Sequence, residues 1–213
     1  EAFSSHIERE LMTHSIVKDH LGPRPLDSHK GTYGHSLIVG GSPRYSGAAY
    51  LASQGALRVG SGLVTLATPK SIYPMLSAKS NEVMTLPLPD NLDGGIHPKA
   101  VKIMESCLSE YDAIGIGCGM GTSVDSQNFI RLLLSQTYLR NMSTLIDADG
   151  LNNLSKIVKW WELLPDNSVI TPHPGEMARL TGVDVKEIQD RREQIASYWA
   201  SFWNVTIVLK GAF

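Results

Sequence analysis

Short runs of apolar and β-branched residues recur along the whole chain, each bounded by Gly, Pro or Asp. Runs of this length and composition predict buried β-strands. Six runs are clear: Ser36–Gly40, Leu63–Ala67, Asp112–Gly117, Thr144–Asp147, Ser168–Thr171 and Val205–Lys210. A seventh run, Glu82–Leu88, is a weaker strand candidate because Pro87 interrupts it.

Helical patterns separate the strands. An apolar stripe predicts a helix from Ser46, its expected N-cap, to Val59, with Gly60 as the stop. The same spacing predicts helices over Val124–Gln136, Leu151–Leu164 and Val185–Trp203. Apolar strands joined by single helices indicate a mostly parallel sheet that is buried on both faces. The predicted fold class is therefore α/β, a three-layer domain with helices on both faces of a central sheet.

Composition excludes several classes of protein. The 213 residues are 42% hydrophobic, and 19 Lys+Arg against 21 Asp+Glu leave a formal net charge of −2, which argues against disorder. Scattered, nearly balanced charges provide no electrostatic footprint for nucleic acid or an anionic membrane. No apolar run approaches the roughly 18 residues of a membrane span. The segment from Glu1 to Met12 lacks a signal-peptide core, so we expect a cytoplasmic protein.

Glycine-rich segments follow two of the predicted strands, where open parallel sheets bind ligands. Gly40 to Ala49 leads into a helix whose free N–H groups suit an anion, although an ordinary strand-to-helix turn explains it equally well. Gly117, Gly119 and Gly121 alternate after another strand, without the spacing of a Rossmann or P-loop motif. Cys118 lies between them with no identifiable basic partner, which favours a packed small residue over a nucleophile.

Polar groups follow three further strands. Asp147 and Asp149 are two residues apart and could order a hydrated Mg²⁺ or polar substrate groups; alternatively, Asp149 caps the next helix. Lys210 ends the last predicted strand, where a point charge suits a phosphate. His173 lies between Pro172 and Pro174, in a stiff loop that presents the imidazole in one orientation.

The first turn of a helix accounts for Glu176, whose charge favours the positive end of the helix dipole. That explanation does not account for His173, which is therefore the strongest single functional candidate.

The order of these segments is more specific than any one of them. From about Ser28 to Phe213 the chain contains HKGTYG, GGSPRYSGAAYLA, GALRVGSGLV, GIGCGMG, LIDADGLN, TPHPGEMARLTG and IVLKGA. This series closely resembles the ADP/ATP-dependent NAD(P)H-hydrate dehydratases of the ribokinase-like superfamily. The resemblance implies a helical lead-in over 1–27 and a ribokinase-like domain over 28–213. Cys118 and Met120 depart from the family's G-P-G-L-G, which alters turn rigidity and leaves the glycines in place.

The resemblance implies that NADH or NADPH hydrate is dehydrated back to the cofactor at the expense of ADP or ATP, with Mg²⁺. The ring hydroxyl is phosphorylated, and phosphate, a better leaving group than hydroxide, is then eliminated. Catalysis is expected from His173 and Asp149, and no metal ligand is assigned. The hydrate is expected at Ala48, Ala49, Gly119, Gly121 and His173, and the nucleotide at Asp147, Asn152, Glu176, Lys210 and Gly211. Relatives are often tetrameric, so a homo-oligomer is expected.

The family also carries a G-[ST]-G-D-x-L motif after the KGA segment, with an anion hole and the expected base. The sequence to Phe213 lacks this motif, so we expect an incomplete chain with weak nucleotide binding and little catalysis. Two alternatives stay open. A ribokinase-like kinase acting on a vitamin or sugar would share the fold and the nucleotide chemistry. A non-catalytic binding protein would keep the hydrate pocket without the nucleotide end.

Overall fold

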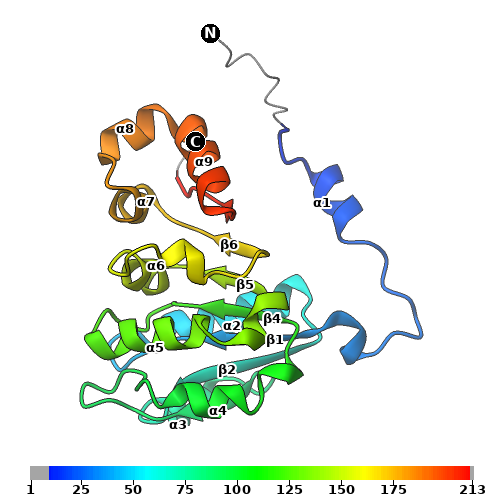
Figure 1. Cartoon of the computed structure of the whole chain (residues 1–213). Helices are drawn as coiled ribbons and strands as arrows, with labels where there is room; N and C mark the ends of the chain where they lie inside the picture. Colours follow the sequence, from blue (N-terminus) through cyan, green and yellow to red (C-terminus); the bar gives the residue numbers. More distant parts are fainter. Residues whose placement is uncertain (1–9, 212–213) are drawn as a thin grey trace.

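Seven parallel strands form one sheet, in the order β3-β2-β1-β4-β5-β6-β7 (Figure 1). The computed structural model describes residues 10–211. The strands are β1 (His35–Val39), β2 (Leu63–Pro69), β3 (Met84–Leu88), β4 (Ala113–Ile116), β5 (Ser143–Ile146), β6 (Ser168–Ile170) and β7 (Thr206–Ile207). All seven predicted strands are present, and every pairing in the sheet is parallel. Pro87 lies in β3 at the edge of the sheet, where a missing N–H donor is tolerated.

Nine α-helices lie within residues 10–211. They are α1 (His14–His20), α2 (Ser46–Val59), α3 (Tyr73–Lys79), α4 (Ala100–Glu105), α5 (Val124–Leu134), α6 (Asp149–Leu154), α7 (Pro174–Thr181), α8 (Val185–Asp190) and α9 (Arg192–Trp203). Short 3₁₀ helices are η1 (Lys30–Tyr33), η2 (Leu108–Glu110), η3 (Thr137–Asn141) and η4 (Trp160–Leu163). Of the predicted lead-in, residues 1–9 lie outside the described part; α1 buries no residue and lies apart from the sheet (Figure 1).

Three helix predictions are wrong in detail. Ser46 is the first residue of α2 and not its N-cap, which is Tyr45 and makes no side-chain capping bond. The other end is as predicted, because Gly60 ends the helix with a left-handed backbone. The predicted helix 151–164 is divided: α6 ends at Leu154, and η4 begins at Trp160 after Lys159, which adopts φ +53°. The ring of Trp160 contacts that of Trp203, at 4.6 Å between centroids. The predicted helix 185–203 breaks at Arg191, whose backbone (φ −131°, ψ 40°) is not helical.

The core has two parts, one on each face of the sheet. Alternate residues of a strand face opposite sides. On one side Leu37 and Val39 pack with apolar residues of α4 to α9 in the larger cluster. On the other side Val64 and Leu66 pack with α2 and α3 in the smaller cluster, which Ile38 also contacts. Helices therefore lie on both faces, as predicted.

The second face is covered unevenly. Residues of β4, β5 and β6, with Ser36 and Ile38 of β1, line an open depression of about 590 Å³ beside α2, and Leu145 within it is 41% exposed. Within residues 10–211, the prediction that the sheet is buried on both faces thus holds for β2, holds only in part for β1, and fails for β4, β5 and β6. None of the helices in the same range is long and apolar enough to cross a membrane.

Candidate functional site

The loops that follow β1, β4, β5, β6 and β7 meet at one edge of the sheet, because parallel strands share the edge where their carboxyl ends lie. Backbone hydrogen bonds join neighbouring loops directly. The N–H of Gly41 donates to the carbonyl of Cys118 at 2.9 Å, and that of Lys210 donates to Pro172 at 2.8 Å. The glycine-rich and polar segments that follow these five strands therefore lie side by side at this edge, whereas HKGTYG and GALRVGSGLV lead into β1 and β2 and lie at the opposite edge.

Alternating glycines after β4 are a requirement of the backbone. Gly117, Gly119 and Gly121 have φ of +123°, +68° and +79°, in the left-handed region that disfavours other residues. A Cβ on Gly117 would lie 2.0 Å from the carbonyl oxygen of Asp147, and one on Gly119 would lie 2.5 Å from that of Tyr45. The glycines thus allow the loops after β1, β4 and β5 to pack against one another.

Asp149 anchors the glycine turn. Its Oδ2 accepts the N–H of Gly121 at 2.9 Å, and its Oδ1 accepts a bond from Asn152 Nδ2 at 3.2 Å. Helix α6 begins at Asp149 itself, after Ala148 at φ +51°, and its cap residue makes no side-chain bond. The alternative prediction that Asp149 caps this helix is therefore wrong.

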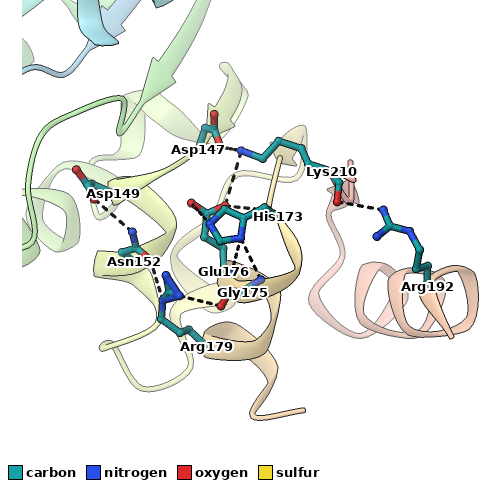
Figure 2. Close-up of polar contacts among 9 residues, drawn as sticks. All are labelled: Asp147, Asp149, Asn152, His173, Gly175, Glu176, Arg179, Arg192 and Lys210. Carbon is teal, nitrogen blue, oxygen red and sulfur yellow. Dashed lines mark hydrogen bonds and ion pairs between the residues drawn. The ribbon is translucent and has the colours of Figure 1, made fainter. Parts of the chain in front are cut away.

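Two residues of the network were missed in the sequence. Asn153 is fully buried, and its Nδ2 donates to the carbonyls of Gly121 and Asp149, each at 2.8 Å. Arg179, on α7, donates from Nε to Asn152 Oδ1 at 3.1 Å and from Nη1 to the carbonyl of Gly175 at 2.9 Å (Figure 2). Asn153 directly follows the LIDADGLN segment and Arg179 lies within TPHPGEMARLTG, so these two segments could have drawn attention to both residues.

His173 is the N-cap of α7. Its Nδ1 accepts the N–H groups of Gly175 and Glu176 at 3.0 and 3.3 Å, and Glu176 Oε2 accepts the His173 N–H at 2.8 Å, which completes a capping box. The prediction that the start of the helix accounts for Glu176 and not for His173 is wrong, because both side chains cap it. Because Nδ1 is an acceptor, the proton of the neutral ring is on Nε2, which lies 3.4 Å from Glu176 Oε1. The loop presents the imidazole in one orientation, as expected, and 48% of the side chain is exposed.

Lys210 joins two acidic groups at the strand ends (Figure 2). Its ammonium lies 2.6 Å from Asp147 Oδ1 and 3.7 Å from Glu176 Oε2. Glu176 is only 5% exposed, so its carboxylate is stabilised by Lys210 and by the His173 N–H. Lys210 is thus held by carboxylates at the strand ends, with 40% of its side chain open to solvent.

Cys118 lies within the same group of loops. Burial raises the pKa of its thiol, the charges of Asp147 and Asp149 raise it further, and Lys210 lowers it. A raised pKa reduces the thiolate fraction at neutral pH, and the thiolate is the nucleophile. This environment supports the interpretation of Cys118 as a packed residue.

A cavity of about 380 Å³ opens beside the glycine turn. Gly121 and Asp149 line it together with Ser42, Arg44 and Tyr45 of the loop after β1. Two predicted substrate residues lie just behind this loop. Ala48 is half-buried near Gly119, whereas Ala49 is fully buried in the smaller core cluster. Ala49 therefore exposes neither its side chain nor its backbone to solvent in this structure.

The described side chains form no all-protein metal centre. Between residues 10 and 211, no group of three or more His, Cys, Asp or Glu side chains is arranged to hold a metal ion. Asp147 is paired with Lys210, and both oxygens of Asp149 accept hydrogen bonds. Mg²⁺ in proteins commonly binds through substrate phosphates and one or two carboxylates.

Comparison with known proteins places this arrangement in a family. The model of the NAD(P)H-hydrate dehydratase family matches residues 36–213. The bifunctional NAD(P)H-hydrate repair enzyme of Moorella thermoacetica is 37% identical over 211 residues, which are 98% of this chain. The chain spans 39% of the length of that relative.

Solved structures agree with the family match. An ADP/ATP-dependent NAD(P)H-hydrate dehydratase of Bacillus subtilis, co-crystallized with ATP and Mg²⁺, has a TM-score of 0.76 and 32% identity, over 97% of this chain and 68% of that one. A ribokinase-like superfamily protein of Enterococcus faecalis has a TM-score of 0.73 at 23% identity, over 89% of this chain and 61% of that one. The latter supports the fold alone, which is ribokinase-like. The chain belongs to the NAD(P)H-hydrate dehydratase family.

Proposed function

We propose that this protein takes part in the nucleotide-dependent dehydration of NADH or NADPH hydrate, which restores the reduced cofactor. The ring hydroxyl oxygen forms a bond to the terminal phosphorus of ADP or ATP, the bridging P–O bond breaks, and the hydroxyl proton passes to a base. The C–O bond then breaks, phosphate leaves with the electron pair, and the adjacent ring carbon loses a proton. AMP or ADP and inorganic phosphate are the other products.

The observation that carries the proposal is the contact network at the strand ends. Asp147, Lys210 and the start of α7 are far apart in the sequence, yet distances of 2.6, 3.7 and 3.4 Å connect Asp147 to Lys210, Lys210 to Glu176, and Glu176 to His173. A partly exposed cation is suited to a phosphate, and the oriented ring N–H of His173 is suited to a polar group of the hydrate. The family match supports the reaction.

In this proposal the hydrate is contacted by Ala48, Ala49, Gly119, Gly121 and His173, and the nucleotide by Asp147, Asn152, Glu176, Lys210 and Gly211. His173 positions the hydrate or handles a proton through Nε2, because Nδ1 is occupied by the helix cap. Asp149 acts in phosphate transfer from the wall of the cavity.

The direct test mixes NADH hydrate and Mg²⁺ with ADP or ATP and the protein, and follows the absorbance of the reduced nicotinamide. We expect nucleotide-dependent recovery of that absorbance. Recovery only from a version extended through a G-[ST]-G-D-x-L segment also supports the proposal and locates the base in the extension. No recovery from either version contradicts it and favours a small-molecule kinase.

A matched pair of variants tests the role of the cation. Lys210→Met should weaken nucleotide binding, because it removes the charge held between Asp147 and Glu176. Lys159→Met is the control, since Lys159 pairs with Glu162 on an exposed surface and 64% of its side chain is solvent-accessible. Equal nucleotide affinity in the two variants would remove Lys210 from the nucleotide site.

Assembly into a homo-oligomer is a further part of the proposal, and light scattering would measure the mass of the assembly.

A further inference from the structure

Arg192, the first residue of α9, reaches the backbone at the end of the last strand. Its Nη2 donates to the carbonyl oxygen of Leu209 at 2.8 Å. It also donates to the carbonyl oxygen of Lys210 at 3.0 Å (Figure 2). The break at Arg191 starts α9 at this point. One half-buried guanidinium therefore binds two successive carbonyls of the segment that contains Lys210.

The carbonyl of Leu209 lies on the outer side of β7, where no further strand within residues 10–211 pairs with it. The amides of Val208 and Lys210 donate to Ile170 and Pro172, at 2.9 and 2.8 Å, and so continue the pairing of β7 with β6. Hydrogen-bonding direction alternates along a strand, which turns the carbonyl of Leu209 away from β6. Because β7 is the last strand in the described order, that group needs another donor. Arg192 supplies it.

Gly211 lies directly against the same guanidinium. A Cβ at this position would lie 2.7 Å from both Nη1 and Nη2 of Arg192. The φ of Gly211 is not in the left-handed region, so a side chain here would conflict only with the end of the Arg192 side chain and would displace it. The glycine after Lys210 and the arginine on α9 are thus complementary parts of one contact.

We propose that Arg192 is a positioning residue for the nucleotide. It fixes the backbone of residues 209–211, and thereby the direction in which Lys210 presents its ammonium toward Asp147. This inference rests on the proposed function, in which Lys210 and Gly211 contact the nucleotide. Without the guanidinium, the segment samples more conformations and pays an ordering cost when the nucleotide binds.

The test compares Arg192→Gln with Arg191→Gln as the matched control. Arg191 is the adjacent residue, is 61% exposed and contacts Glu187 on α8 at 3.5 Å. Calorimetry measures the Kd for ADP, and hydrogen exchange measures protection of the Lys210 amide. We expect Arg192→Gln to raise the Kd about tenfold, equivalent to about 1.4 kcal/mol, and to speed exchange at Lys210. Arg191→Gln should change neither, and Arg192→Lys should restore part of both.

The outcomes separate this inference from the proposed function. An Arg192→Gln variant with the wild-type Kd for ADP overturns the positioning role, as does an equal loss in Arg191→Gln. If neither this chain nor a version extended through a G-[ST]-G-D-x-L segment binds ADP, the proposed function is overturned instead. In that case, faster hydrogen exchange at the Lys210 amide of Arg192→Gln still supports the role of Arg192 in fixing this backbone. Unchanged exchange in that variant overturns this role.

Discussion

Replacing His173 by Ala and by Asn separates its two roles. The imidazole Nδ1 accepts two N–H groups at the start of α7, and Ala leaves both without a partner. Loss of an N-cap costs about 1 kcal/mol, within a range of about 0.5–2 kcal/mol. For a domain of this size that lowers the Tm by about 2–4 °C. Asn is among the best N-cap residues, so His173→Asn should recover most of the lost stability.

Activity should follow a different order. Both variants lack the Nε2–H that lies 3.4 Å from Glu176 Oε1, so both should lose about a hundredfold or more of the turnover of NADH hydrate. Urea unfolding measures the stability, and recovery of nicotinamide absorbance measures turnover. If Asn were as destabilising as Ala, the cap would not explain the stability. If either variant kept wild-type turnover, His173 would not belong to the active site.

Three further predictions follow from the glycine turn and its cysteine. Gly117→Ala should cost about 3 kcal/mol or more in urea unfolding, because its Cβ would lie 2.0 Å from a backbone oxygen. A Cβ on Gly121 would meet no atom within 4 Å, so Gly121→Ala should cost only about 1–2 kcal/mol, the strain of a left-handed backbone. Equal losses of stability in the two variants would refute the argument that Gly117 is needed for close packing. In a Cys107→Ser background, alkylation of Cys118 should be slow at neutral pH and become fast only above the pH at which an ordinary thiol ionises, since burial and nearby carboxylates raise its pKa. Adding Lys210→Met removes the charge that lowers this pKa, so alkylation should slow further, and a faster reaction would contradict the assignment.

Much of the fold could be predicted because its signals are local. Each strand is a short apolar run with a breaker at its end, and such runs appear in the chain whatever their neighbours are. Connections through single helices imply parallel pairing. The glycines at 117, 119 and 121 were found by their alternation, and their positive φ values explain why that alternation exists. The places where prediction failed, such as the break at Arg191, have no Gly or Pro to mark them.

Individual residues of the candidate site could be identified from the sequence, but the contacts between them could not. From the sequence alone, His173 stood out by its two flanking prolines, and Lys210 by its place at the end of a strand. The sequence does not show that His173 caps α7 and that the Glu176 carboxylate accepts the His173 N–H in turn. A histidine that binds a ligand and a histidine that caps a helix would have the same neighbours in the sequence.

What the sequence determined by itself is the order of elements, the parallel sheet, the edge at which the loops gather, and the family. What only the tertiary structure decided is which groups are partners: Lys210 with Asp147, Asn153 with Gly121, and Arg192 with the carbonyls of residues 209 and 210. The physical reason is the distance along the chain over which each interaction acts. Strand and turn preferences act over a few residues, whereas these contacts join segments that only the packing of helices onto the sheet brings within hydrogen-bond distance.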